Sequence, residues 1–109
     1  MLPKPYRLPA HKIRKTLLLG TLKRGQLVNL RLLPHPRNKL TRLAITIPLK
    51  IDKRATLRNR LKRVLGEIFR TTPAWLNLGV DLVVIAQAKA VSAKTAEFKQ
   101  ELTDLLLGK

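Results

Sequence analysis

The sequence contains no cysteine, few aromatic residues and few acidic ones. Without cysteine there are no disulfides, no cysteine-based zinc sites and no thiol nucleophile. The four aromatics are Tyr6, Phe69, Trp75 and Phe98, so any core must be mainly aliphatic. No apolar stretch approaches the roughly 20 residues of a membrane-spanning helix, and the N-terminus has no signal-peptide-like apolar segment. These absences predict a soluble, cytoplasmic protein.

Acidic residues are so scarce that the net charge is extreme. Six Asp and Glu stand against 23 Lys and Arg, a formal charge of +17. Residues 1–42 contain 11 basic and no acidic side chains, whereas residues 71–109 contain four of each. These positive charges repel one another in the folded protein. Binding of a polyanion removes this repulsion and is also favoured by the release of the polyanion's counterions. We therefore expect a nucleic-acid partner. A membrane surface would require apolar or aromatic anchors on a basic helix.

The length of 109 residues suits one domain, and a hydrophobic content of 45 % is enough for one modest core. We expect residues 1–109 to form a single nucleic-acid-binding domain, with residues 1–9 as an extended basic segment because Pro3, Pro5 and Pro9 disfavour helix. No internal repeat is present.

Hydrophobic periodicity predicts the order α-β-β-(β)-α-β-α. We expect a first helix over 10–19 ended by Gly20, strands over 26–33 and 42–49, and a turn over 34–39. The sequence does not locate a third early strand: it could lie within residues 43–54, or the sheet could divide differently there. A helix over 55–70 is the strongest element, followed by a strand over 80–86 whose continuous apolar run suits burial on both faces. The last helix runs from Ser92 or Ala93, with Ser92 as a candidate cap, to Leu107, before Gly108.

The helix over 55–70 has two chemically different sides. Its apolar stripe comprises Leu57, Leu61, Val64, Leu65 and Ile68, and its other side Asn59, Lys62, Arg63, Gly66 and Arg70. Seven basic residues fall between positions 50 and 63. Arg offers planar two-pronged donation to phosphate, Lys a point charge and Asn an amide for sugar or base edges. These charges could instead be an ordinary solvated face, but such a face normally alternates Glu with Lys, and Glu67 is the helix's only acid.

Independent catalysis finds little support. His11 and His35 are expected in surface or loop positions, and Asp81 as a turn or strand-end partner rather than a metal ligand. The solvated side of the last helix is expected to hold Glu97, Glu101 and Asp104. Neither a phosphate-cradling glycine loop nor a paired-acid motif is present, so we predict no catalytic and no metal-binding residues in the protein.

The segment Arg58-Asn59-Arg60-Leu61-Lys62-Arg63, preceded by Ala55-Thr56 and followed by Glu67 and Phe69, closely resembles the signature of the protein subunit of bacterial ribonuclease P. The Asp-led apolar run over 80–86 and the amphipathic stretch over 98–107 are similar to later family elements, and Tyr6-Arg7-Leu8 and Gly20 to earlier ones. The similarity spans nearly the whole chain and is strongest over 50–107.

The resemblance implies an α/β (α+β) two-layer sandwich of order αβββαβα with a left-handed βαβ crossover. It also implies that a large RNA subunit cuts the 5′ leader from precursor tRNA, using Mg²⁺ that acts through this RNA. The protein assists by binding that RNA and the leader, and alone is not catalytic. The partners implied are ribonuclease P RNA and precursor tRNA, with no membrane and no obligate protein partner.

The family's functional positions map onto two sets of residues here. The catalytic-RNA-binding set is Arg58, Asn59, Arg60, Lys62 and Arg63, supported by Lys50, Lys53 and Arg54. The leader-binding cleft, between the first helix and the sheet, comprises Lys12, Ile13, Arg14, Lys15, Leu17, Leu30 and Arg31. The family usually has aromatics where Ile13, Leu17 and Leu30 stand, so leader binding here would depend on charge and apolar contact. These three residues could alternatively be ordinary core.

Two alternative functions remain open from the sequence. Small structural RNA-binding proteins of the ribosomal type also use basic α/β domains. A non-specific DNA- or RNA-coating protein would also be basic, but its binding would be indifferent to RNA fold.

Overall fold

A computed structural model describes residues 4–34, 40–51 and 54–107 of the chain. Its elements are, in chain order, η1 (Lys4–Tyr6), α1 (Ala10–Leu19), β1 (Thr21–Arg24), β2 (Val28–Pro34), β3 (Arg42–Thr46), α2 (Ala55–Arg70), η2 (Pro73–Asn77), β4 (Val80–Ala86), η3 (Ala88–Ser92) and α3 (Thr95–Leu107). The four strands form one sheet of order β1-β2-β4-β3. β4 lies antiparallel to β2 and parallel to β3.

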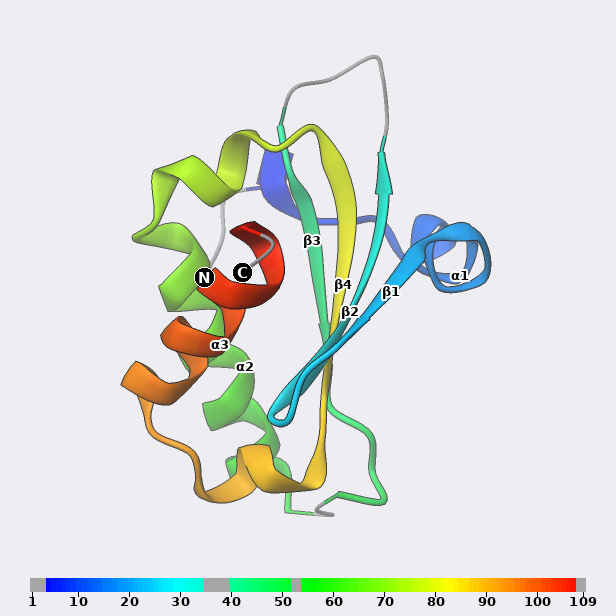
Figure 1. The fold of residues 1–109 in the computed structure, drawn as a ribbon. Coiled ribbons are helices and arrows are strands. Elements are labelled where there is room, and N and C mark those ends of the chain that lie inside the picture. Colours follow the sequence, from blue (N-terminus) through cyan, green and yellow to red (C-terminus); the bar gives the residue numbers. More distant parts are fainter. Residues whose placement is uncertain (1–3, 35–39, 52–53, 108–109) are drawn as a thin grey trace.

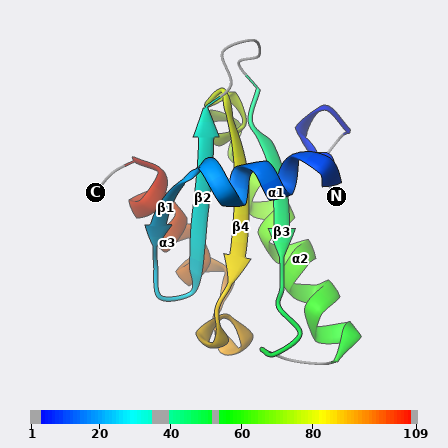
Figure 2. The ribbon, with the colours of Figure 1, turned by 90° about the vertical axis from the view of Figure 1, so that its right-hand side faces the viewer.

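The parallel pair β3 and β4 is joined through α2 by a crossover of unusual hand. In Figure 2 both strands run downward, α2 lies behind the sheet, and the chain steps leftward from β3 to β4. This path is left-handed, whereas nearly all βαβ connections are right-handed. The left-handed crossover expected from the resemblance is therefore confirmed, as is the mixed α+β fold of order αβββαβα.

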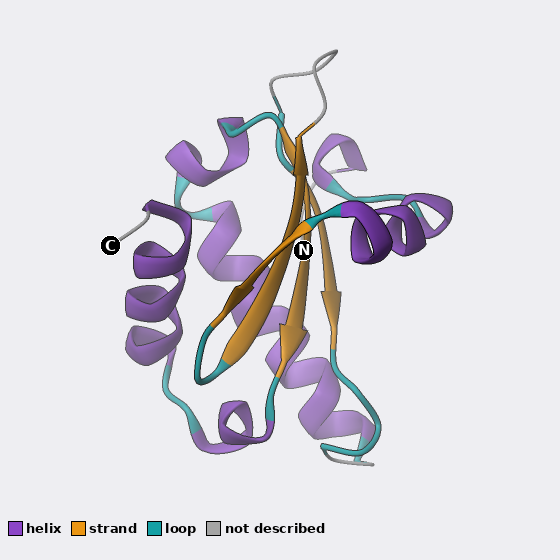
Figure 3. Cartoon of the chain, turned by 45° about the vertical axis from the view of Figure 1, so that its right-hand side comes forward, coloured by secondary structure: helices purple, strands orange, loops and turns teal. Residues whose placement is uncertain are grey.

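The helices divide between the two faces of the sheet (Figures 1 and 3). α2 and α3 cover one face, and α1 crosses the other at a steep angle to the strands. The main core lies between the sheet and the α2–α3 layer, where Leu30, Leu65, Phe69, Phe98 and Leu102 are at most 1 % exposed. Each such side chain contributes about 1.5–3 kcal/mol on burial. The central strand β4 has both faces covered, as its apolar run predicts.

α2 follows the predicted pattern closely. Leu61, Leu65 and Ile68 are buried, and Phe69 packs edge-on against Trp75 with ring centroids 5.3 Å apart. Its bounds coincide with the expected 55–70, and those of α1 and β4 with 10–19 and 80–86. The bounds of α1, α2 and β4 were thus predictable from the pattern of apolar residues.

The structure corrects expectations about secondary structure in the N-terminal half of the chain. The additional early strand is β1, directly after α1, and does not lie within 43–54. The sequence pattern of β1 did not indicate a strand, because this segment is a strand through its pairing with β2. The first nine residues are not uniformly extended: Lys4–Tyr6 form a 3₁₀ turn, and Arg7 then bridges to Leu43. The strand expected over 42–49 stops at Thr46, before Pro48.

α3 begins later than expected, because Ser92 ends the 3₁₀ turn η3 instead of capping the helix. The cap lies at Lys94, whose backbone N–H donates to the Glu97 carboxylate over 2.9 Å. This is the Glu half of a capping box. Gly108 and the turn residues 35–39 lie outside the described residues. No described helix has the length and apolar character needed to cross a membrane.

Candidate RNA-binding surfaces

Four neighbouring exposed polar side chains on the outer side of α2 form what we call the α2 ridge: Asn59, Arg60, Lys62 and Arg63. They point away from the core because Leu61 and Leu65, on the same helix, are turned toward the sheet. Burial of the apolar stripe thereby sets the rotation of the helix and holds the cations in a defined order on its outer side.

Arg58 differs from the other signature residues. It is half-buried, and its Nε and Nη2 both donate to the carbonyl of Ile47, over 3.4 and 3.3 Å. The acceptor is a neutral backbone group, so the charge of Arg58 is not cancelled. The bonds are long, and they tie the first turn of α2 to the segment that leaves β3.

No described carboxylate pairs with the cations of the α2 ridge. Glu67, one turn further along, accepts a bond from the Nε of Arg70 over 3.0 Å. This hydrogen bond lowers the pKa of Glu67 and raises that of Arg70. Arg60, Lys62 and Arg63 consequently retain their charge for an external anion.

The supporting residues do not share one location. Arg54 is exposed directly before α2. Lys50 lines a hollow of about 470 Å³ at the end of the sheet with Asn29 and Ile85. Lys53 lies outside the described residues.

Gly66 was expected on the polar side of α2, and this expectation is wrong. It is buried facing β3, where a Cβ would find only Ile45 Cδ1 within 4 Å, at 3.9 Å. The helical wheel misplaced it because the edge of the sheet extends further around α2 than the leucine stripe indicates.

Thr16 in α1 and Gly20 at its end are the tightly enclosed positions of this helix. Thr16 is fully buried, and its hydroxyl donates to the carbonyl of Lys12 over 3.0 Å. The N–H of Gly20 donates to the Thr16 carbonyl over 2.8 Å. A Cβ at Gly20 would lie 2.5 Å from that oxygen and 3.0 Å from the Leu32 carbonyl oxygen. Gly20 therefore ends the helix as expected, but by close approach, with a negative φ of −73°.

The expected cleft residues on α1 differ in exposure. Lys12 and Ile13 are half-buried beside Thr16, whereas Arg14, Lys15 and Leu17 are exposed. Leu17 is 36 % exposed and is therefore not core. Arg31 of β2 is half-buried and donates from Nη1 to the Gly20 carbonyl over 3.3 Å, next to the end of α1.

Leu30 was expected in the cleft, and the structure contradicts this placement. It is fully buried in the core beneath α2 and α3, on the face opposite α1. Side chains alternate along a strand, so its neighbours Asn29 and Arg31 occupy the face of α1. Leu30 follows the alternative reading, ordinary core.

Sequence reasoning missed Asn29 and Ile85, which lie on the face of α1 and line the hollow with Lys50. The alternation of β2 could have indicated Asn29. No signal was available for Ile85, because β4 is apolar at nearly every position.

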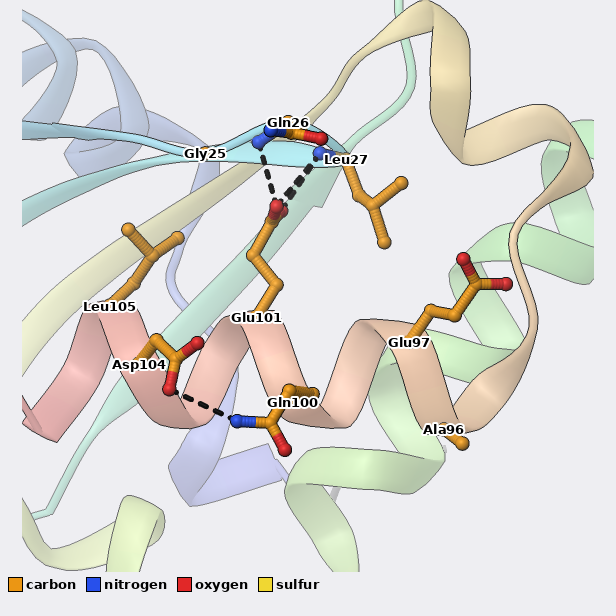
Figure 4. Close-up of a pocket in the computed structure, with 9 residues that line it drawn as sticks. All are labelled: Gly25, Gln26, Leu27, Ala96, Glu97, Gln100, Glu101, Asp104 and Leu105. Carbon is orange, nitrogen blue, oxygen red and sulfur yellow. Dashed lines mark hydrogen bonds between the residues drawn. The ribbon is translucent and has the colours of Figure 1, made fainter. Parts of the chain in front are cut away.

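Two carboxylates, those of Asp81 and Glu101, bond to residues far away in the sequence. Asp81 accepts bonds from Nε and Nη2 of Arg42, over 2.8 and 2.9 Å, which confirms its expected strand-end role. Glu101 was expected to be solvated, and this is wrong: its carboxylate accepts backbone N–H bonds from Gln26 and Leu27 in the β1–β2 turn (Figure 4). It also accepts one from Val28, the first residue of β2. Within the described ranges, no three His, Asp or Glu side chains come together as metal ligands.

Together, the left-handed α+β sandwich and the cations of the α2 ridge, which have no acidic partner in the described part of the chain, define a small RNA-binding protein. Residues 2–108 match the Ribonuclease P family model. Ribonuclease P protein components from Pseudanabaena sp. and Picosynechococcus sp. are 32 % and 33 % identical over 107 residues, covering 97 % of this chain and 92 % and 91 % of theirs. A component from Cyanothece sp. is 43 % identical over 65 residues, about half of its own length.

Solved structures agree with these relatives. The ribonuclease P protein from Thermotoga maritima superposes with a TM-score of 0.82 at 25 % identity, over 94 % of this chain and 96 % of that one. That of Staphylococcus aureus gives 0.82 at 23 % identity, over 94 % and 93 %, and supports the fold alone. The chain belongs to the ribonuclease P protein family. It is a protein component of this tRNA 5′-maturation endoribonuclease and acts with an RNA subunit.

Proposed function

We propose that the protein binds two RNA segments at once. The α2 ridge binds ribonuclease P RNA, and the face crossed by α1 receives the single-stranded 5′ leader of precursor tRNA. The observation that carries this proposal is that α1 and α2 lie on opposite faces of the sheet (Figure 1). A folded RNA on the ridge therefore leaves the other face accessible.

The two surfaces suit different RNA shapes. The α2 ridge presents three cations and one amide on the outer side of a helix, which fits the phosphates of a folded RNA. The face of α1 combines exposed cations, Arg14 and Lys15, with apolar side chains, Ile13 and Leu17. Such a mixture fits an unpaired strand, whose bases are available for apolar contact.

We further propose that the reaction takes place in the cytoplasm and that its Mg²⁺ is held by the RNA. The described part of the protein offers no cluster of three ligating side chains, which supports placing the metal on the other subunit. The contribution of the protein is then electrostatic: it binds and orients two polyanions.

Reconstitution with ribonuclease P RNA at low Mg²⁺ tests the proposal. The protein alone should not cleave precursor tRNA, and it should stimulate cleavage by the RNA. Reversing Arg60 and Lys62 together to Glu should abolish binding of ribonuclease P RNA. Reversing Arg14 and Lys15 together to Glu should leave the binding of ribonuclease P RNA intact. It should weaken only the binding of substrates that carry a leader.

A protein that fails to stimulate its matching RNA would falsify the proposal. Co-purification with ribosomal particles, without precursor-tRNA cleavage, would favour the alternative of a structural ribosomal-type protein. Equal loss of RNA binding on charge reversal in α1 and in α2 would indicate a non-specific coating protein.

A further inference from the structure

A groove of about 450 Å³ lies between α2 and the edge of β3. One wall is the outer side of α2, and the other includes Arg7, which bridges to Leu43 and so extends the sheet edge. The volume falls within the range of about 300–1,000 Å³ typical of small-molecule sites. The groove adjoins the α2 ridge, since Asn59, Lys62 and Arg63 belong to both.

The floor of this groove is apolar, and its opening is polar. Leu43, Ile45 and Gly66 form the floor, where Leu43 is 4 % exposed. Position 66 has no side chain, which leaves this space open. Even a Cβ added at Gly66 would not fill it, because the Cβ would lie 3.9 Å from the nearest atom of Ile45. The described residues that line the groove include no carboxylate, so none of them opposes a negatively charged ligand.

This arrangement favours one kind of occupant. Lys62 and Arg63 at the opening attract phosphate, while the apolar floor suits the flat face of a base. The amide of Asn59 can both donate to and accept from a base edge. Bases within a duplex cannot reach such a floor, whereas an unpaired nucleotide can turn its base into it. We propose that the groove binds one unstacked nucleobase of ribonuclease P RNA.

The inference rests on the proposed function, because the RNA concerned is the one that the α2 ridge binds. It adds a different kind of contact. Phosphate contacts on the ridge hold position without reading sequence, whereas a base in the groove selects an unpaired nucleotide at one place in the RNA. The protein would then recognise the folded RNA by the position of a single extruded base.

Filling the groove with Gly66→Met is the direct test, with Ala96→Met, at an exposed position of α3, as the matched control. The affinity for ribonuclease P RNA should fall about tenfold, toward the low end of what a stacked base contributes. The slope of log affinity against log salt should stay unchanged, because no phosphate contact is lost. One nucleotide protected by the wild type should become reactive to base-specific reagents. Ala96→Met should behave as wild type.

Asn59→Ala provides a second test that does not depend on packing, since Asn59 is exposed. It should reduce affinity without changing the salt slope, and should expose the same nucleotide. Unchanged affinity in both variants, or a reduced salt slope in both, overturns the groove proposal. A change in oligomeric state with Gly66→Met would instead assign the groove to a second copy of this chain. Failure of the wild type to bind ribonuclease P RNA would overturn the proposed function itself.

Discussion

The carboxylate of Glu101 in α3 accepts hydrogen bonds from the backbone N–H of Leu27, over 3.1 and 2.8 Å, although the two residues are 74 positions apart. The same carboxylate accepts from the backbone N–H of Gln26 over 2.7 Å (Figure 4) and from that of Val28 over 2.8 Å. A single side chain thus satisfies three successive donors of a turn and fixes the β1–β2 hairpin to the helical layer.

Replacing Glu101 with Ala should lower the free energy of unfolding by about 1–3 kcal/mol, because the turn's N–H groups lose a charged acceptor. Urea denaturation measures this change. Asp104→Ala, on the same helix, removes only an exposed bond with Gln100 and should stay within about 0.5 kcal/mol of wild type. Equal effects of the two substitutions would contradict the role assigned to Glu101.

Two glycine-to-alanine substitutions should have opposite effects on stability. At Gly20 the added Cβ would meet the Thr16 carbonyl oxygen at 2.5 Å, so Gly20→Ala should destabilise the fold by about 1–3 kcal/mol. At Gly66 the helix gains a better helix former without a clash, so Gly66→Ala should stabilise by about 0.5–1 kcal/mol. Thermal unfolding of the two variants should show shifts of opposite sign.

The Glu67–Arg70 pair should produce a pH dependence at the acid side. The pKa of Glu67 is lowered in the folded state from its ordinary value of 4.5, mainly by the hydrogen bond from Arg70. Its stabilising contribution is therefore present above that ordinary value and is lost as the pH falls through the lowered pKa. Wild type should lose more stability than Glu67→Gln between about pH 6 and pH 3.

The pair is exposed, so high salt should reduce that difference. Denaturant unfolding at two salt concentrations provides the comparison. An identical acid dependence in wild type and Glu67→Gln would refute the contribution of the pair.

Neutralising single cations of the α2 ridge should change the salt dependence of RNA binding. Each of Arg60→Ala and Lys62→Ala should reduce the slope of log affinity against log salt by about 0.7–0.9, the value for one lost phosphate contact. Arg14→Ala, on the opposite face, is the matched control and should leave the slope for ribonuclease P RNA unchanged. Filter binding over a salt series measures all three.

Much of this protein follows from its sequence alone. The stripe from Leu57 to Ile68 defines α2 and its polar side, because a period of 3.6 residues separates the two sides of a helix whatever packs against it. The apolar run of 80–86 predicted the central strand, and the excess of cationic side chains predicted a polyanionic partner. The ridge residues Asn59, Arg60, Lys62 and Arg63 are exposed as the pattern predicted.

The tertiary structure alone decided which residues meet. Leu30 belongs to the core and Arg31 to the face of α1 because pairing with β4 sets the register of β2, and a shift of one residue exchanges the faces. Gly66 borders a groove because β3 passes beside α2, and Glu101 caps a turn because α3 packs against a distant hairpin. Local patterns report the neighbours of a residue along its own element, whereas these contacts join segments far apart in the chain and depend on how the layers pack.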